Sequence, residues 1–130
     1  MVISDEGEII ENFCRVSWGW KALNADPNFY HEGSGFSTFT YKGKTFTTAI
    51  CGDLWDEANL VAIEDLQVDC VLWPCYVDFS INKWERGEKE EYAFCVKDIL
   101  APTFLINSYV EDEQKAKGGC FVFSGNIILQ

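Results

Sequence analysis

Two short runs of mostly apolar residues constrain the fold of this chain most strongly: VDCVLWP at 68–74 and FLINSYV at 104–110. Continuous apolar runs of this length are typical of strands that are buried on both faces of a sheet. Between them, residues 87–100 place Tyr92, Cys95, Val96 and Ile99 at helical spacing, and Pro102 then disfavours helix at the residue before it. The sequence therefore predicts two buried strands separated by a helix.

Three hairpins are expected around this centre. In each, two strand-like runs flank a short turn: residues 1–16 with a turn at 5–7, residues 36–50 with a turn at 41–44, and residues 118–130 with a turn at 124–126. A further helix is predicted over 54–66, with Leu54, Ala58, Val61 and Leu66 along one stripe, and an irregular loop precedes residue 36. This order indicates an α/β (α+β) fold: a mixed sheet with helices on one face.

Composition limits the classes of function. A chain of 130 residues with 48% hydrophobic content is about one domain with a real core. A net charge of −11, with the few basic residues scattered, argues against nucleic acid as a partner. No apolar run approaches the roughly 18 residues of a membrane span, and the acidic N-terminus is unlike a signal peptide. A cytoplasmic location, away from membranes, is the expectation.

Six cysteines and a single histidine, His31, are present. Without a CxxC pair or clustered histidines, a metal-binding or thiol redox module is the least favoured interpretation, and no cofactor is expected. Most of the cysteines lie in apolar segments and fit small buried side chains. His31 lies in a loop, where a lone histidine is more often a surface residue than a catalytic base.

Cys51 has a different context, in FTTAICGDLWDEANL at 46–60. A strand-like run ends at the cysteine, Gly52 permits a tight turn, and a helix-like segment follows. The first amides of a helix favour a thiolate and can bind an oxyanion, as a cysteine nucleophile requires. The alternative is a small residue buried at a strand end, and the local sequence leaves both open.

The segment TAICGDLWDE resembles the cysteine motif of the nitrilase superfamily of carbon–nitrogen hydrolases. Ile50-Cys51, Asp53 and Glu57 match that motif, and Asp56 stands where the family has proline. On either side of this motif, DEGEIIENFCRV, VDCVLWPCYVDFS and GGCFVFSGNII resemble further family segments in the same order. The resemblance spans nearly the whole chain and implies part of an αββα four-layer sandwich. Residues 1–130 would then be a single partial domain that lacks its N-terminal half.

The family uses a Glu-Lys-Cys triad, and the resemblance implies Cys51 as the nucleophile. Arg15 falls at the position of the lysine, whereas Lys21 is a weaker candidate six residues later. Arginine keeps the positive charge but presents a planar fork, so this replacement is not conservative. No residue matches the catalytic glutamate; Glu32 and Asp26 lie where many members carry a supporting acid.

The resemblance also implies a substrate pocket. Gly52 would lie in the oxyanion-hole turn, and Trp73, Tyr76 and Phe79 would form an aromatic wall, although Trp73 is equally suited to the core. The implied activity is hydrolysis of a non-peptide carbon–nitrogen bond, amidase-like, through a cysteine thioester on a small amide or nitrile. The chain alone is expected to be inactive and to pair with the missing N-terminal half, a partner chain or a second copy of itself. The alternative is a non-catalytic scaffold or binding subunit, which the arginine at the lysine position favours.

Overall fold

The structure, a computed structural model, describes residues 1–19, 21–77, 80–111, 117–125 and 127–129. Among these residues it contains one six-stranded sheet, a separate two-stranded hairpin and two helical segments. The hairpin pairs β1 (Val2–Ile3) with β2 (Ile9–Glu11), and the sheet has the order β3 (Thr38–Tyr41), β4 (Lys44–Thr48), β5 (Cys70–Cys75), β6 (Thr103–Asn107), β7 (Cys120–Ser124) and β8 (Ile127–Leu129).

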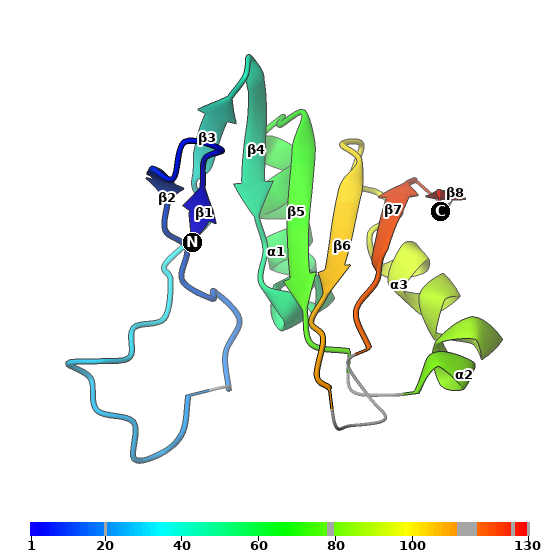
Figure 1. Cartoon of the computed structure of the whole chain (residues 1–130), viewed down its shortest axis with the longest axis horizontal. Helices are drawn as coiled ribbons and strands as arrows, with labels where there is room; N and C mark the ends of the chain where they lie inside the picture. Colours follow the sequence, from blue (N-terminus) through cyan, green and yellow to red (C-terminus); the bar gives the residue numbers. More distant parts are fainter. Residues whose placement is uncertain (20, 78–79, 112–116, 126, 130) are drawn as a thin grey trace.

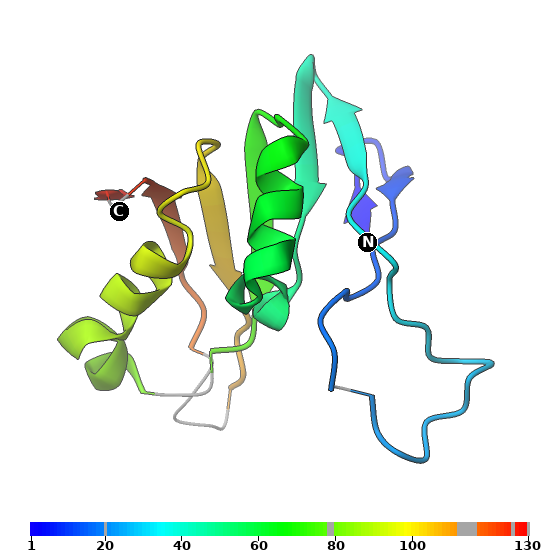
Figure 2. The same ribbon diagram turned by 180° about the vertical axis from the view of Figure 1, so that it is seen from behind.

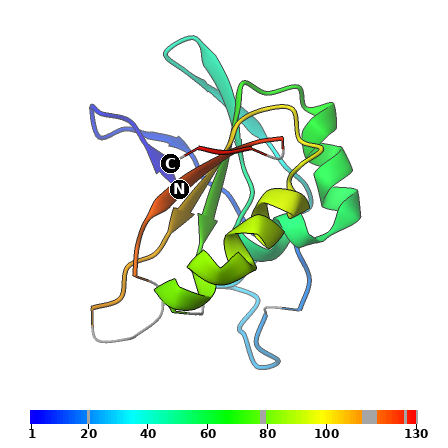
Figure 3. The same cartoon turned by 90° about the vertical axis from the view of Figure 1, so that its right-hand side faces the viewer.

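The sheet is mixed, as the sequence predicts. Strands β4, β5 and β6 are parallel neighbours, whereas β3, β7 and β8 pair antiparallel at the two sides. Helix α1 (Glu57–Asp65) connects β4 to β5, and the segment α2 (Ile81–Lys83), η2 (Trp84–Glu88) and α3 (Lys89–Cys95) connects β5 to β6. Both helical segments cover the same face of the sheet (Figures 2 and 3). The carboxyl ends of β4, β5 and β6 consequently meet at one edge, and the long loop after β2 hangs from the same end (Figure 1).

The hairpins lie where the sequence predicts them. In the β3–β4 turn, Lys42 and Gly43 both have positive φ (48° and 76°), the conformation of a two-residue turn whose twist matches that of its strands. The β1–β2 hairpin turns over residues 4–8, and Asp5 in this turn accepts hydrogen bonds from the side chains of Tyr41 and Lys42. Phe13, two residues after β2, packs against the sheet with its ring centroid 5.9 Å from that of Phe39. The last turn includes residue 126, which lies outside the described residues.

The helix predicted over 54–66 is divided in two. A 3-10 turn, η1 (Cys51–Trp55), follows β4 directly, and α1 begins only after Asp56, whose carboxylate accepts hydrogen bonds from the N–H groups of Ala58 and Asn59. The predicted stripe was wrong in part: Ala58 and Val61 are exposed, and Ile63 is the buried residue of α1. Because the extended backbone at Asp56 separates Leu54 from α1, helical spacing counted from Leu54 does not identify the face of α1 that is buried.

The second helical segment also differs in extent from the prediction over 87–100. It begins at Ile81, where the Ser80 side chain accepts a hydrogen bond from the N–H of Lys83, and α3 ends at Cys95. The charged residues at 85–91 gave no apolar periodicity, so this early start was missed. Of the predicted apolar face, Tyr92 and Cys95 lie in α3 and pack against the core, whereas Val96 and Ile99 are buried beyond the end of the helix.

The core lies between the helices and one face of the sheet. Its largest fully buried side chains include Trp73, Leu105 and Phe123. The opposite face carries apolar side chains that neither helical segment of the described chain covers: along β6, Thr103 and Leu105 are buried, whereas Ile106 on the other face is 45% exposed. No helix among the described residues is long and apolar enough to cross a membrane.

Candidate active site

Cys51 lies at the edge where the parallel strands end. The N–H of Ala49 donates to the carbonyl of Leu72 at 2.9 Å, so the β4–β5 pairing, which includes Thr48 opposite Leu72, extends past the end of β4. Counting onward in this register brings Cys51 level with Cys75, the last residue of β5. The backbone turns sharply here, and Cys51 has a φ of 49°, which is rare for a residue with a side chain. The predicted strand-to-helix turn at the cysteine is therefore present, as a 3-10 turn.

Several donors surround the Cys51 sulfur and lower the pKa of its thiol from 9.0 to about 6. The largest cause is a hydrogen bond from the Cys75 side chain, and smaller ones are the N–H groups of Tyr76 and Gly52 and the positive charge of Arg15. Partial burial of the sulfur opposes them. The same contact raises the pKa of Cys75, because its proton is held against the Cys51 sulfur and because it is buried. The site therefore favours a thiolate on Cys51 and a proton on Cys75.

Trp73 holds the main chain of the nucleophile candidate. Its indole N–H donates to the carbonyl oxygen of Cys51 at 2.7 Å, and its ring is fully buried. The ring packs against those of Tyr92 and Phe123, at centroid distances of 5.2 and 6.3 Å. Of the two roles that the sequence allowed for Trp73, pocket wall or core residue, the structure shows the core residue. Its indole N–H also fixes the main chain at the strand end.

Asp53 connects the turn to the loop after β2. One carboxylate oxygen accepts from the N–H groups of Val16 and Ser17, at 3.1 and 2.7 Å, and the other accepts from the N–H of Ile50 at 2.7 Å. The side chain is only 1% exposed. A buried carboxylate that satisfies three backbone donors is a structural clamp, and this one joins segments 37 residues apart.

Arg15 lies beside this clamp, within electrostatic range of the Cys51 sulfur. Its Nε donates to the Ser17 hydroxyl at 2.7 Å and lies 4.0 Å from an Asp53 oxygen. Its carbonyl accepts from the N–H of Gly33 at 2.7 Å. The start and the end of the long loop approach each other closely at this point: a Cβ added to Gly33 would lie only 2.8 Å from the Cys14 carbonyl oxygen.

The structure thus brings together four of the residues that the sequence singles out: Cys51, Gly52, Tyr76 and Arg15. Tyr76 is 44% exposed and acts on the sulfur through its main chain. Glu32 is exposed, one residue from the Gly33 contact, and Phe79 lies outside the described residues.

The other candidates lie in the long loop. Lys21 is exposed and lies 5.9 Å from the centroid of the Tyr30 ring, and His31 is exposed nearby in the sequence. The Asp26 carboxylate accepts from the N–H of Asn28 within its own turn.

Sequence reasoning missed Cys75, which it treated as one of several small buried residues. Its position at the end of a buried run was visible, but its pairing with Cys51 depends on strand register.

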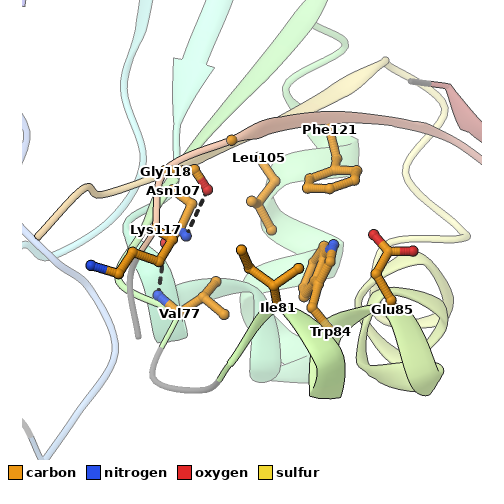
Figure 4. Close-up of a pocket in the computed structure, with 10 residues that line it drawn as sticks. Val77, Ile81, Trp84, Glu85, Leu105, Asn107, Lys117, Gly118 and Phe121 are labelled. Carbon is orange, nitrogen blue, oxygen red and sulfur yellow. Dashed lines mark hydrogen bonds between the residues drawn. The ribbon is translucent and has the colours of Figure 1, made fainter. Parts of the chain in front are cut away.

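A pocket of about 240 Å³ lies at the same edge of the sheet (Figure 4). Asn107, the sheet partner of Cys75, accepts from the N–H of Val77 at 2.9 Å and donates to the carbonyl of Gly118 at 3.0 Å, which fixes one side. The apolar lining comes from Ile81, Trp84, Leu105 and Phe121. Neither Cys51 nor Tyr76, both of which the structure describes, lines this pocket, so it is separate from the sulfur.

Comparisons with known proteins agree with this architecture. No family model and no curated protein matches the sequence. Among solved structures, the chain is similar to a glutamine-dependent NAD+ synthetase from Acinetobacter baumannii in complex with adenosine diphosphate, with a TM-score of 0.66 and 17% identity over 96% of this chain and 26% of that one. It is also similar to a carbon-nitrogen hydrolase from Helicobacter pylori G27, with a TM-score of 0.66 and 14% identity over 95% of this chain and 48% of that one.

The chain therefore spans about a quarter of one neighbour and about half of the other. At these identities the likeness concerns the fold, and it agrees with the resemblance that the sequence motifs carry. The 130 residues have the fold of part of a carbon–nitrogen hydrolase domain of the nitrilase type.

Proposed function

We propose that this chain forms part of a carbon–nitrogen hydrolase in which the Cys51 thiolate attacks the carbonyl carbon of a small amide. The observation that carries the proposal is the surroundings of the Cys51 sulfur: a thiol donor from Cys75, two backbone N–H groups and the charge of Arg15. A thiolate, rather than a thiol, is the nucleophile in such chemistry. The position of Cys51 on a strained strand end supports the same role.

In the proposed reaction, attack forms a carbon–sulfur bond and moves an electron pair onto the carbonyl oxygen. The N–H groups of Gly52 and Tyr76, which contact the free sulfur, would then donate to this developing oxyanion. Collapse of the intermediate breaks the carbon–nitrogen bond, and the amine leaves after taking up a proton. Water then attacks the thioester and releases a carboxylic acid, which restores the Cys51 thiol. Arg15 would contribute positive charge from the position of the family's lysine.

We further propose that the general base comes from additional chain, of this polypeptide or of a partner. The Asp53 carboxylate, which lies 4.0 Å from the Arg15 Nε, is already occupied by three backbone N–H groups. Both structural neighbours are longer than this chain, which covers 26% and 48% of them. Because general-base assistance is commonly worth about 10²–10⁴-fold, the chain alone should have little or no amidase activity.

The apolar face of the sheet opposite the helices supports the proposal that additional chain packs there as a further layer. We propose that, when the 130 residues are alone, a second copy covers this face, so that sedimentation velocity detects association that grows with concentration. Ile106→Asn should weaken that association, whereas Val61→Asn, at a somewhat more exposed position on the helical side (54% against 45%), should not. A monomer at every concentration, or equal effects of the two substitutions, would contradict this part of the proposal.

Acylation by an activated ester tests the nucleophile without requiring the missing base. The chain is incubated with p-nitrophenyl acetate, and acyl groups that hydroxylamine removes are assigned by peptide mass spectrometry. We expect the acetyl thioester on Cys51 to exceed that on Cys70 and Cys95, whose pKa values are raised by burial. Cys51→Ser should lose this adduct. Equal labelling of the three cysteines would contradict an activated nucleophile, and turnover of a simple amide by the chain alone would refute the missing base.

A second candidate function is a scaffold or binding subunit that keeps the fold without the chemistry. Arg15 in place of the lysine favours it, because a planar guanidinium that also bonds Ser17 differs from a mobile ammonium. The acylation experiment separates the two candidates, since a scaffold has no need of a reactive Cys51.

A further inference from the structure

Cys51 and Cys75 come together from neighbouring parallel strands although 23 residues separate them in the sequence. Cys75 is the last residue of β5, and Cys51 lies three residues beyond the end of β4, at the level of Cys75 when the β4–β5 register is continued. Adjacent strands lie about 4.8 Å apart, which is within the roughly 4.4–6.8 Å that Cα atoms span across a disulfide. The two side chains are already in hydrogen-bond contact. We propose that Cys51 and Cys75 are a modification site, at which a hydroperoxide converts the two thiols into a reversible intramolecular disulfide.

The other cysteines are less suited to resolve an oxidised Cys51. The thiol of Cys95 donates to the carbonyl oxygen of Leu54 at 2.8 Å, which directs it to a different neighbour. Cys70 lies on β5 at an odd number of residues from Cys75, so its side chain points to the opposite face of the sheet. Cys14 and Cys120 are exposed. Cys75 is the cysteine that the structure holds against the Cys51 sulfur.

The proposed oxidation has two steps. The Cys51 thiolate attacks the peroxide oxygen, which breaks the O–O bond and gives a sulfenic acid and hydroxide or an alkoxide. The Cys75 sulfur then attacks the Cys51 sulfur, the S–O bond breaks, and water leaves with the proton of Cys75. Two thiols thus lose two electrons and two protons to the peroxide, and a dithiol reverses the reaction by exchange.

The exposures of the two residues fit these roles. Cys51 is half-buried and reachable by a small peroxide, whereas Cys75 is only 5% exposed and is reached from Cys51. The positive charge of Arg15 acts on both sulfurs and would support the transient Cys75 thiolate. The disulfide would block Cys51 as a nucleophile and protect it from irreversible oxidation. The inference concerns the thiols alone and does not depend on hydrolysis.

Peptide mapping of the full chain tests the proposal. The reduced protein is treated with a small excess of hydrogen peroxide, remaining thiols are alkylated, and the chain is cleaved before aspartate without reduction. Four aspartates lie between Cys51 and Cys75, so the two cysteines fall on separate peptides. We expect one linked pair of peptides that lacks two hydrogens and joins Cys51 to Cys75, and we expect dithiothreitol to remove it. Cys70→Ser, the matched control on the same peptide, should leave this pair unchanged.

Cys75→Ser should abolish the linked pair and leave a Cys51 sulfenic acid that dimedone traps, which a merely misfolded variant would not produce selectively. Three outcomes would overturn the proposal: linkage of Cys51 to another cysteine, disulfides only between chains on a non-reducing gel, or an oxidised Cys51 beside an unmodified Cys75 in the unsubstituted chain. Absence of any oxidation at Cys51 would also overturn it. Failure of acylation by the ester would leave this result unaffected, so the two proposals can fail separately.

Discussion

The thiol of Cys75 should control the acidity of Cys51, and Cys75→Ala tests this directly. Its hydrogen bond is the largest of the causes that lower the pKa of Cys51 to about 6. A hydrogen bond to a charged acceptor contributes about 1.5–3 kcal/mol, and about 1.4 kcal/mol corresponds to one pKa unit. Removing the donor should therefore raise the pKa of Cys51 by about one to two units, with the remaining N–H donors and Arg15 keeping it below the ordinary value of 9.0.

The assay follows alkylation of Cys51 by iodoacetamide against pH, with each cysteine quantified by peptide mass spectrometry. The rate rises with pH as the thiolate forms, so its midpoint reports the pKa of Cys51. At a pH near 6, about half of Cys51 is thiolate in the unsubstituted chain, and about 1–10% should be thiolate in Cys75→Ala. Cys75→Ser keeps a donor of similar size and should keep most of the lowered pKa.

An unchanged midpoint in Cys75→Ala would refute the reasoning, because the first cause of the lowered pKa would then contribute nothing. Equal shifts in the alanine and serine variants would also refute it, since loss of packing rather than of a donor would be responsible. Cys95, whose pKa burial raises to about 11, provides the internal reference in every sample.

Two further predictions concern the loops that hold the site. Asp53→Ala should lower the free energy of unfolding in urea by about 3–5 kcal/mol, because it leaves three backbone N–H groups without an acceptor, whereas Asp56→Ala, which removes an exposed helix cap, should cost about 1 kcal/mol. Equal losses would contradict the clamp. Gly33→Ala should push the loop away from the Cys14 carbonyl and lower the alkylation rate of Cys51, while Gly35→Ala, whose added Cβ meets nothing within 4 Å, should not. A reactive Cys51 in Gly33→Ala would show that this contact does not position Arg15.

Much of the fold could be predicted because its signals are local. The buried runs at β5 and β6 and the turn at Lys42-Gly43 each follow from neighbouring residues. The start of the second helical segment at Ile81 was missed because its charged side chains hide any apolar face. The buried face of α1 was predicted wrongly because the spacing was counted from Leu54, which an extended residue, Asp56, separates from the helix.

The candidate site divides in the same way. Cys51 could be singled out because a strand end, a glycine and a helix start are consecutive in the sequence. The placement of Arg15 beside the sulfur could be expected only from the family resemblance. Arg15 lies in the long loop between β2 and β3, whose sequence has no periodicity from which its position could be predicted. Cys75 could not be assigned, because its contact with Cys51 depends on the relative register of two strands. The three N–H groups that donate to Asp53 likewise could not be predicted, because two of them come from a distant loop that only the tertiary fold brings close.

The left-handed backbone at Cys51 sets folding and reactivity against each other at one residue. An L-amino acid in that conformation is less stable than glycine by about 1–2 kcal/mol. Selection for thermodynamic stability alone would therefore favour Cys51→Gly, a substitution that removes the sulfur and the strain together. A cysteine at this position therefore lowers the free energy of unfolding through its backbone conformation. Cys51→Ala would keep this conformational strain, and Cys51→Gly would remove it. The difference in unfolding free energy between those two variants measures how far this fold departs from its own optimum to present a thiol.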